Sequence, residues 1–142
     1  MSLDNLLNIS LEKIVPDNTV INRLLKSATR NIQDAHFQEI SNENRFDAAY
    51  KAIMQLANLA LQAHGYRTLT SKPGHHMTMI QSLTQTLMVD KETVIVLDAL
   101  RKQRNIIDYT GDLVPDSLVI GCISSAEDLL KNINEYLRNN TK

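Results

Sequence analysis

Residues that form turns are scarce in this sequence, which has only four glycines and three prolines among 142 residues. Sheet-rich folds need frequent turns and helical bundles need few, so this scarcity favours an all-α chain. The single cysteine, Cys122, excludes an intrachain disulfide and favours a reducing compartment. No apolar run reaches the ~18 residues of a membrane span, and the first residues lack the basic start of a secretory signal. We therefore expect a cytoplasmic protein with no membrane partner.

The sequence also has no excess of positive or negative charge, with 15 Lys and Arg against 16 Asp and Glu. The net charge of −1 excludes a strongly basic nucleic-acid binder, so any contact with RNA needs a local basic patch. Two Phe, four Tyr and no Trp argue against an aromatic platform for single strands. No Gly-rich phosphate loop or Gly-x-Ser-x-Gly elbow occurs, and we expect no cofactor. Without repeats or linkers, residues 1–142 read as a single domain.

Apolar residues recur at helical spacing in six segments, which predict an antiparallel bundle of five to six helices. The segments are about Leu3–Ile14, Thr19–Phe37, Asn44–His64, His75–Met88, Lys91–Tyr109, and a last one that opens at Pro115 or Asp116. Asp17 or Asn18 and Asp90 are suited to cap helix starts, and Gly65 and Gly111 to close helix ends. The third segment is apolar around so much of its circumference that we expect it at the centre. A loop is expected over Tyr66–Gly74.

Polar residues gather on one side of the fifth segment. Arg101, Arg104, Asn105 and Asp108 are separated by steps of three and four, and Tyr109 lies in the same arc. Two guanidiniums beside an amide would suit a phosphate, because arginine offers forked donors to phosphate oxygens. Alternatively, Asp98–Arg101 and Arg104–Asp108 are surface pairs worth only ~0.2–0.5 kcal/mol each.

Four stretches carry a resemblance to a known family. They are Leu100–Tyr109 (LRKQRNIIDY), Arg45–Tyr50 (RFDAAY), Ala63–Tyr66 (AHGY) and Pro73–His76 (PGHH). In this order the stretches resemble the HEPN family of helical, nucleotide- and RNA-associated proteins. The resemblance implies a helical bundle, a homodimer, and in many members a metal-independent RNase. In those members an Arg polarises the scissile phosphate and a His transfers a proton, at the interface between protomers.

The family motif is incomplete in this chain. Arg104 matches the motif Arg, and Asn105 matches the residue that often follows it. The fourth to seventh positions after Arg104 are Asp108, Tyr109, Thr110 and Gly111, and none of them is the His of the motif. A Tyr with an ordinary pKa of ~10 is a poor base at neutral pH, and an Asp beside arginines should stay ionised. The resemblance thus implies a nucleotide- or RNA-binding module that is a degenerate RNase or part of a toxin–antitoxin-like system with a protein partner. Catalytic residues stay unassigned.

Two alternatives remain open. An active metal-independent ribonuclease would use His75 or His76 in place of the missing motif His. A non-catalytic structural dimer would leave the polar face solvated or at an interface. The family resemblance and the broad apolar surfaces of the third and sixth segments favour a dimer in each case.

His75 and His76 follow Pro73-Gly74 at an expected helix start, where free backbone N–H groups favour anions. Helix capping or loop packing would explain them equally well. Adjacent helical residues point about 100° apart, and no Cys, Asp or Glu accompanies the two histidines at ligand spacing, so no metal is expected. In the composite site that we expect, Arg101, Arg104 and Asn105 hold phosphate, Asp108 and Tyr109 orient them, and His75 and His76 close the site.

Overall fold

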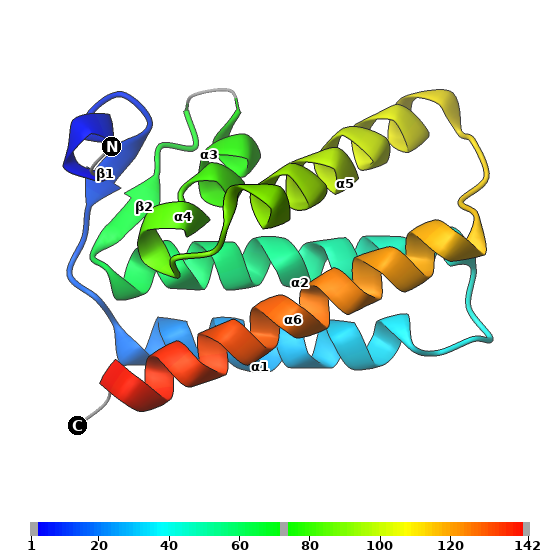
Figure 1. Ribbon diagram of the computed structural model, residues 1–142, viewed down its shortest axis with the longest axis horizontal. Coiled ribbons are helices and arrows are strands. Elements are labelled where there is room, and N and C mark those ends of the chain that lie inside the picture. Colours follow the sequence, from blue (N-terminus) through cyan, green and yellow to red (C-terminus); the bar gives the residue numbers. More distant parts are fainter. Residues whose placement is uncertain (1–2, 72–73, 141–142) are drawn as a thin grey trace.

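The computed structural model describes residues 3–71 and 74–140, and most of this length is helical (Figure 1). The helices are α1 (Asn18–Ala35), α2 (Asn42–Ala63), α3 (His75–Gln81), α4 (Leu83–Thr86), α5 (Lys91–Thr110) and α6 (Asp116–Asn140). A 3₁₀ turn (η1, Leu3–Leu6) and a small two-stranded sheet (β1, Leu11–Lys13; β2, Tyr66–Thr68) accompany them. The prediction of an all-α helical bundle is confirmed.

The central helix is α2, as its wide apolar surface predicted. Figure 1 shows α1 and α6 on one side of it and α3, α4 and α5 on the other, and all five pack against it. Its side chains Phe46, Ile53, Leu56 and Leu59 are fully buried. The apolar stripe of α6 is buried within the same core. The two apolar surfaces that had favoured a dimer are therefore used inside the chain, so a homodimer would have to form through other surfaces.

Capping side chains fix the ends of the long helices. Asp17 accepts a hydrogen bond from the Thr19 N–H at 2.9 Å and begins α1, and Asp90 does the same for α5 through Thr93 at 2.8 Å. Gly111 ends α5 with φ +71°, a left-handed conformation that glycine adopts without steric cost. These ends agree with the sequence-based prediction because the caps are local.

The prediction of a helix over Leu3–Ile14 is wrong. The chain makes the short turn η1, takes a positive φ of 64° at Asn8, and continues as β1, which pairs antiparallel with β2. Leu11 is fully buried in a small second cluster with Leu61 and Tyr66. The spacing of the leucines fits a helix, but Asn and Ser favour turns and the pairing with β2 satisfies the backbone. The same pairing makes Tyr66–Thr68, expected as loop, a strand.

The segment expected as one helix over His75–Met88 is interrupted. The α3 helix ends at Gln81 and α4 begins at Leu83, and the Ser82 hydroxyl between them donates to the Met79 carbonyl at 2.8 Å. A serine side chain bonded to a preceding carbonyl commonly bends a helix. Pro73, which was expected to precede this helix, lies outside the described residues. Within the described ranges, no helix has the length and apolarity needed to cross a membrane.

Candidate functional site

A cleft of about 620 Å³ lies where α2, α3 and α5 meet. Its lining residues come mainly from one face of α2, where steps of three and four residues place side chains in a row. The lining consists of Asp47, Tyr50, Lys51, Met54, Gln55 and Asn58 from α2, Thr70 from the loop after β2, His75, His76 and Met79 from α3, and Arg104 from α5. Arg104 and the two histidines, far apart in the sequence, therefore line the same cleft.

Arg104 is held above the ring of Tyr50. Its Cζ atom lies 5.0 Å from the ring centroid, within the range of a cation–π interaction. Its Nε is 3.3 Å from a carboxylate oxygen of Asp47 and 4.0 Å from one of Asp108. Both ion pairs are longer than the ~2.7–2.9 Å of a strong charge-assisted bond. The Arg104 side chain remains about one-third exposed (32%), so its guanidinium is positioned but still accessible to a ligand.

Tyr50 joins the arginine to the histidines. The body of its side chain is buried in the core, while its hydroxyl lies 3.2 Å from Nδ1 of His76. The rings of Tyr50 and His76 are 6.1 Å apart, and the His75 ring meets the His76 ring edge-on at 4.7 Å. Tyr50 therefore contacts a cation through its ring and an imidazole through its hydroxyl.

The protonation states of this group follow from burial and from the nearby positive charges. Burial raises the pKa of Tyr50 to about 12, although Arg104 and Arg101 act in the opposite direction. Burial also lowers the pKa of His76, and His75, Arg104 and Arg101 lower it further because they disfavour a second cation nearby. At neutral pH, Tyr50 is thus protonated and His76 is neutral.

The lowered pKa of His76 leads to a prediction for solution measurements. Its NMR titration should give a pKa below the ordinary histidine value of 6.5, and Arg104→Ala should raise that pKa because it removes one of the opposing cations. The folded protein then binds fewer protons than the unfolded chain near pH 6, so the contribution of His76 to stability is present above pH 6.5 and is lost as the pH falls. A wild-type midpoint at or above 6.5 would contradict the geometry of this group.

Not all of the residues expected in the composite site reach the cleft. Arg101 instead donates to Asp98 at 2.8 Å, and both side chains are only 18% exposed. That bond to Arg101 is the main reason that the pKa of Asp98 is lowered. The pair matches the alternative of an ordinary ion pair within the helix, and Arg101 acts on the cleft only through its charge.

Asn105 and Tyr109, which were expected to act with Arg104, are not brought into the cleft. Asn105 is exposed and Tyr109 is 93% exposed, and neither lines the cleft. Successive helical residues turn by about 100°, so the side chain after Arg104 points away from the face that Arg104 uses. Asp108 lies one turn further along that face, exposed and at 4.0 Å from Arg104.

The sequence did not indicate any of the six α2 residues that line the cleft, among them Asp47, Tyr50 and Lys51. Asp47 and Tyr50 belong to the Arg45–Tyr50 stretch that carried part of the family resemblance, but the helical pattern indicated only that Tyr50 faces the core. Their spacing of three and four residues, which combines an acid, a tyrosine and a lysine on one side of a helix, was the available signal. Among the described residues, no group of three or more His, Cys, Asp or Glu side chains could hold a metal ion.

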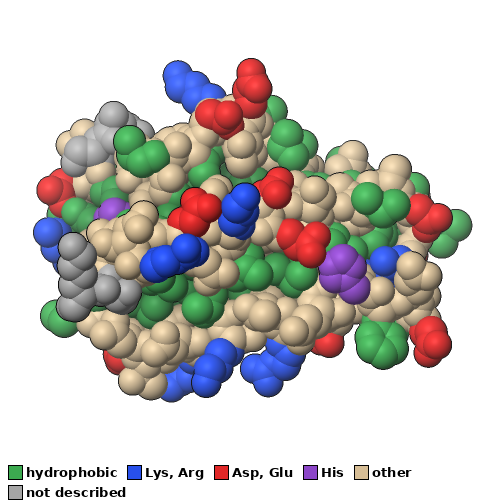
Figure 2. Space-filling model, turned by 60° about the horizontal axis from the view of Figure 1, so that its bottom comes forward, with side chains coloured by type: hydrophobic (Ala, Val, Ile, Leu, Met, Phe, Trp, Pro, Cys, Tyr) green, Lys and Arg blue, Asp and Glu red, His purple; other side chains and the backbone are tan. Residues whose placement is uncertain are grey.

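No protein-family model matches this chain, and no curated protein sequence matches it. Charges of both signs are interspersed over the face drawn in Figure 2, in agreement with the net charge near zero. A charged ligand would thus be attracted by a local group of side chains and not by the electrostatic field of the whole molecule.

Proposed function

We propose that this chain is a HEPN-like nucleotide- or RNA-binding module that holds a phosphate in the cleft at Arg104. The observation that supports this most is the guanidinium of Arg104, which is held over Tyr50 in a cleft that His75 and His76 also line. Lys51 adds a second positive charge to the lining. An arginine with forked donors and a nearby ammonium form a recurrent arrangement for binding phosphate.

The carboxylates of the site limit what it binds. Asp47 and Asp108 face Arg104 at 3.3 and 4.0 Å, so they hold its side chain in place and would repel an anion that approached too closely from their side. A phosphate would therefore approach Arg104 from the histidine side of the cleft. The homodimer, and a protein partner of the toxin–antitoxin type, rest on the family resemblance alone.

A second candidate function is metal-independent RNA cleavage. It is favoured by His76, whose lowered pKa keeps the imidazole neutral and able to accept a proton near Arg104. In that reaction His76 would take the proton of a ribose 2′-hydroxyl while Arg104 polarises the phosphate, and the departing 5′-oxygen would need a proton from another group. The Nδ1 atom of His76 lies 3.2 Å from the Tyr50 hydroxyl, which leaves Nε2 for a ligand. Because positions 108–111 hold no His where the family motif has one, we expect binding without efficient cleavage.

One assay separates these functions. Mixed RNA is incubated in EDTA with the wild-type protein, Arg104→Ala, His76→Ala, and Arg30→Ala on the exposed surface of α1 as a matched control. Acid–base help typically contributes ~10²–10⁴-fold to a rate, so a true ribonuclease would lose its activity visibly without His76. We expect salt-sensitive binding and no robust cleavage. Robust cleavage by the wild type and by Arg30→Ala, lost in the other two, would establish the ribonuclease, and neither activity would leave a structural protein.

A further inference from the structure

A second concave feature lies between α5 and α6, away from the lining of the Arg104 cleft. The two helices run in opposite directions and are joined by residues 111–115 (Figure 1). Their main packing partners are different, because α5 packs on α3, α2 and α4 while α6 packs on α2 and α1. The seam between the two helices contains one hollow toward each end and is named the α5/α6 furrow.

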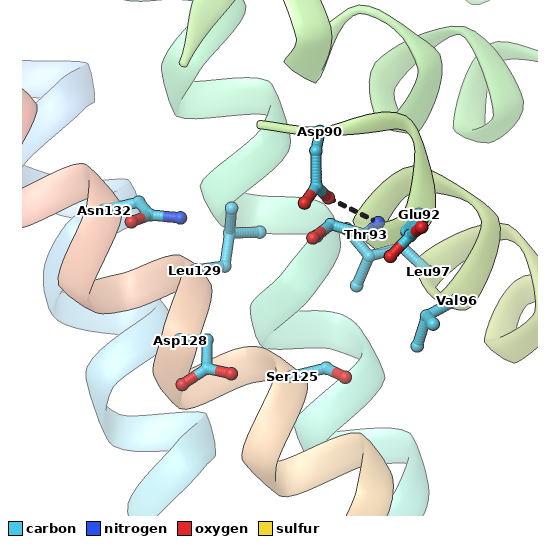
Figure 3. A pocket seen from close by; sticks show the side chains of 9 residues that line it. All are labelled: Asp90, Glu92, Thr93, Val96, Leu97, Ser125, Asp128, Leu129 and Asn132. Atoms are coloured by element: carbon cyan, nitrogen blue, oxygen red, sulfur yellow. Dashed lines mark hydrogen bonds between the residues drawn. The ribbon is translucent and has the colours of Figure 1, made fainter. Parts of the chain in front are cut away.

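Two hollows mark the ends of the α5/α6 furrow. One, of about 420 Å³, lies at the start of α5, where Glu92 and Val96 face Ser125 and Asp128 of α6 (Figure 3). The other, of about 410 Å³, lies near the end of α5 and includes Gln103, Ile106, Ile107, Leu113 and Leu118. The lining residues share one face of each helix, since Glu92, Val96, Gln103 and Ile107 on α5, and Leu118, Ser125 and Asn132 on α6, recur at helical spacing.

The furrow combines an apolar floor with an acidic rim. Leu97 and Leu129 are buried at its base, while Val96 and Ile106 are each 51% exposed along its edge. Carboxylates line both ends: Asp90, Glu92 and Asp128 at one and Asp112 at the other. No Lys or Arg lies among the described residues that line either hollow. An apolar surface with a rim of one sign is complementary to an amphipathic segment of the opposite sign.

We propose that the α5/α6 furrow binds a basic amphipathic helix of a partner protein. The stretch of α5 from Glu92 to Ile107 spans roughly 22 Å at ~1.5 Å per residue, enough for about four turns of a bound helix. Apolar side chains of the partner, spaced at helical intervals, would cover Val96, Leu97 and Leu129. Its flanking Lys or Arg side chains would meet the carboxylates. Near the start of α6, between Leu118 of one hollow and Ser125 of the other, a side chain added at Gly121 would meet open space.

A second copy of this chain fits the furrow poorly. On α1, Arg23, Lys26 and Arg30 are exposed, but the neighbouring Leu24 and Leu25 pack against the core and offer no apolar anchors beside these charges. Binding in the furrow is also independent of phosphate binding, because Arg104 lines the cleft and does not line either hollow of the furrow. Loss of one activity should therefore leave the other intact.

The probe is a displayed library of 18-residue helical peptides that carry fixed apolar residues at i, i+3, i+7 and i+10 and random flanks, selected on the wild-type protein. Selected peptides should be rich in Lys and Arg on the flanks. Both Val96→Asp and the double variant Glu92→Lys/Asp128→Lys should weaken their binding at least tenfold, because the first places a charge in the apolar contact and the second reverses the rim. Asp34→Lys on the exposed surface of α1 is the matched charge control and should bind as the wild type does.

Three kinds of result would overturn the proposal. The first is that the library gives no more enrichment than a library with scrambled apolar positions. The second is that the selected peptides lack the predicted properties, because their flanks are acidic or because they bind the furrow variants as tightly as the wild type. The third is a wild-type dimer in light scattering that Val96→Asp converts to a monomer, since a second copy would then occupy the furrow. Val96 is half exposed, so its replacement should leave the helical circular dichroism unchanged and the comparison valid.

Discussion

Replacing Arg104 by Ala should weaken the binding of RNA or a nucleotide by roughly 10- to 100-fold, because a hydrogen bond to a charged group is worth ~1.5–3 kcal/mol. The guanidinium is the positive group held most firmly in the cleft, over Tyr50 and beside Asp47. Arg104→Lys should recover only part of the affinity, since lysine restores the charge but not the forked donors. Fluorescence anisotropy with a labelled RNA, at several salt concentrations, measures the effect.

The matched control for this variant is Arg30→Ala, which removes the same charge from the exposed face of α1. It should leave the affinity within about twofold of the wild type, because an exposed charge more than a Debye length of ~8 Å from the site is largely screened. The slope of affinity against salt should become shallower in Arg104→Ala, since one fewer counterion is released on binding. Equal losses in the two variants would mean that the protein attracts RNA through its general charge and not through the cleft.

Replacing Phe46 by Ala should lower the free energy of unfolding by ~3–5 kcal/mol, the usual cost of removing a buried aromatic side chain. Phe46, in the second turn of α2, is 1% exposed, and its ring lies 6.5 Å from that of Tyr50. Small domains are stable by only ~5–15 kcal/mol, so this one change would remove a large share of the total. Urea unfolding followed by circular dichroism measures it.

The second phenylalanine of the chain provides the control. Phe37 follows α1 and is 61% exposed, so Phe37→Ala should change stability by no more than about 0.5 kcal/mol. Similar losses in the free energy of unfolding for Phe46→Ala and Phe37→Ala would contradict the placement of α2 at the centre of the core. Because Phe46 packs beside Tyr50, its replacement should also weaken ligand binding at temperatures where the protein remains folded.

Much of the fold could be predicted from the sequence because the determining signals are local. Apolar spacing placed the long helices, and Asp17, Asp90 and Gly111 marked ends that the structure confirms. The N-terminal strand could not be predicted in this way, because β1 depends on pairing with β2, more than fifty residues later in the chain. The break at Ser82 is equally unmarked by the apolar pattern, which continues through it.

The site was predictable only in part, for a related reason. Helical spacing shows which face of a helix is buried, but not where the polar tip of a buried side chain ends. Tyr50 was therefore expected only as core, although its hydroxyl reaches His76 in the cleft. Asn105 and Tyr109 were expected in the site because they lie in the polar arc of α5, yet that arc is wider than the strip that faces α2 and α3.

The most direct test of phosphate binding in the cleft is an NMR titration of the four histidine side chains with a ribonucleoside monophosphate in EDTA. His75 and His76 line the cleft, whereas His36 pairs with Glu127 and His64 with the Thr86 carbonyl, so the last two are internal controls. We predict saturable shifts of His75 and His76, unchanged His36 and His64, and loss of the shifts in Arg104→Ala. Equal shifts of all four histidines, or none at millimolar ligand, would contradict phosphate binding at Arg104.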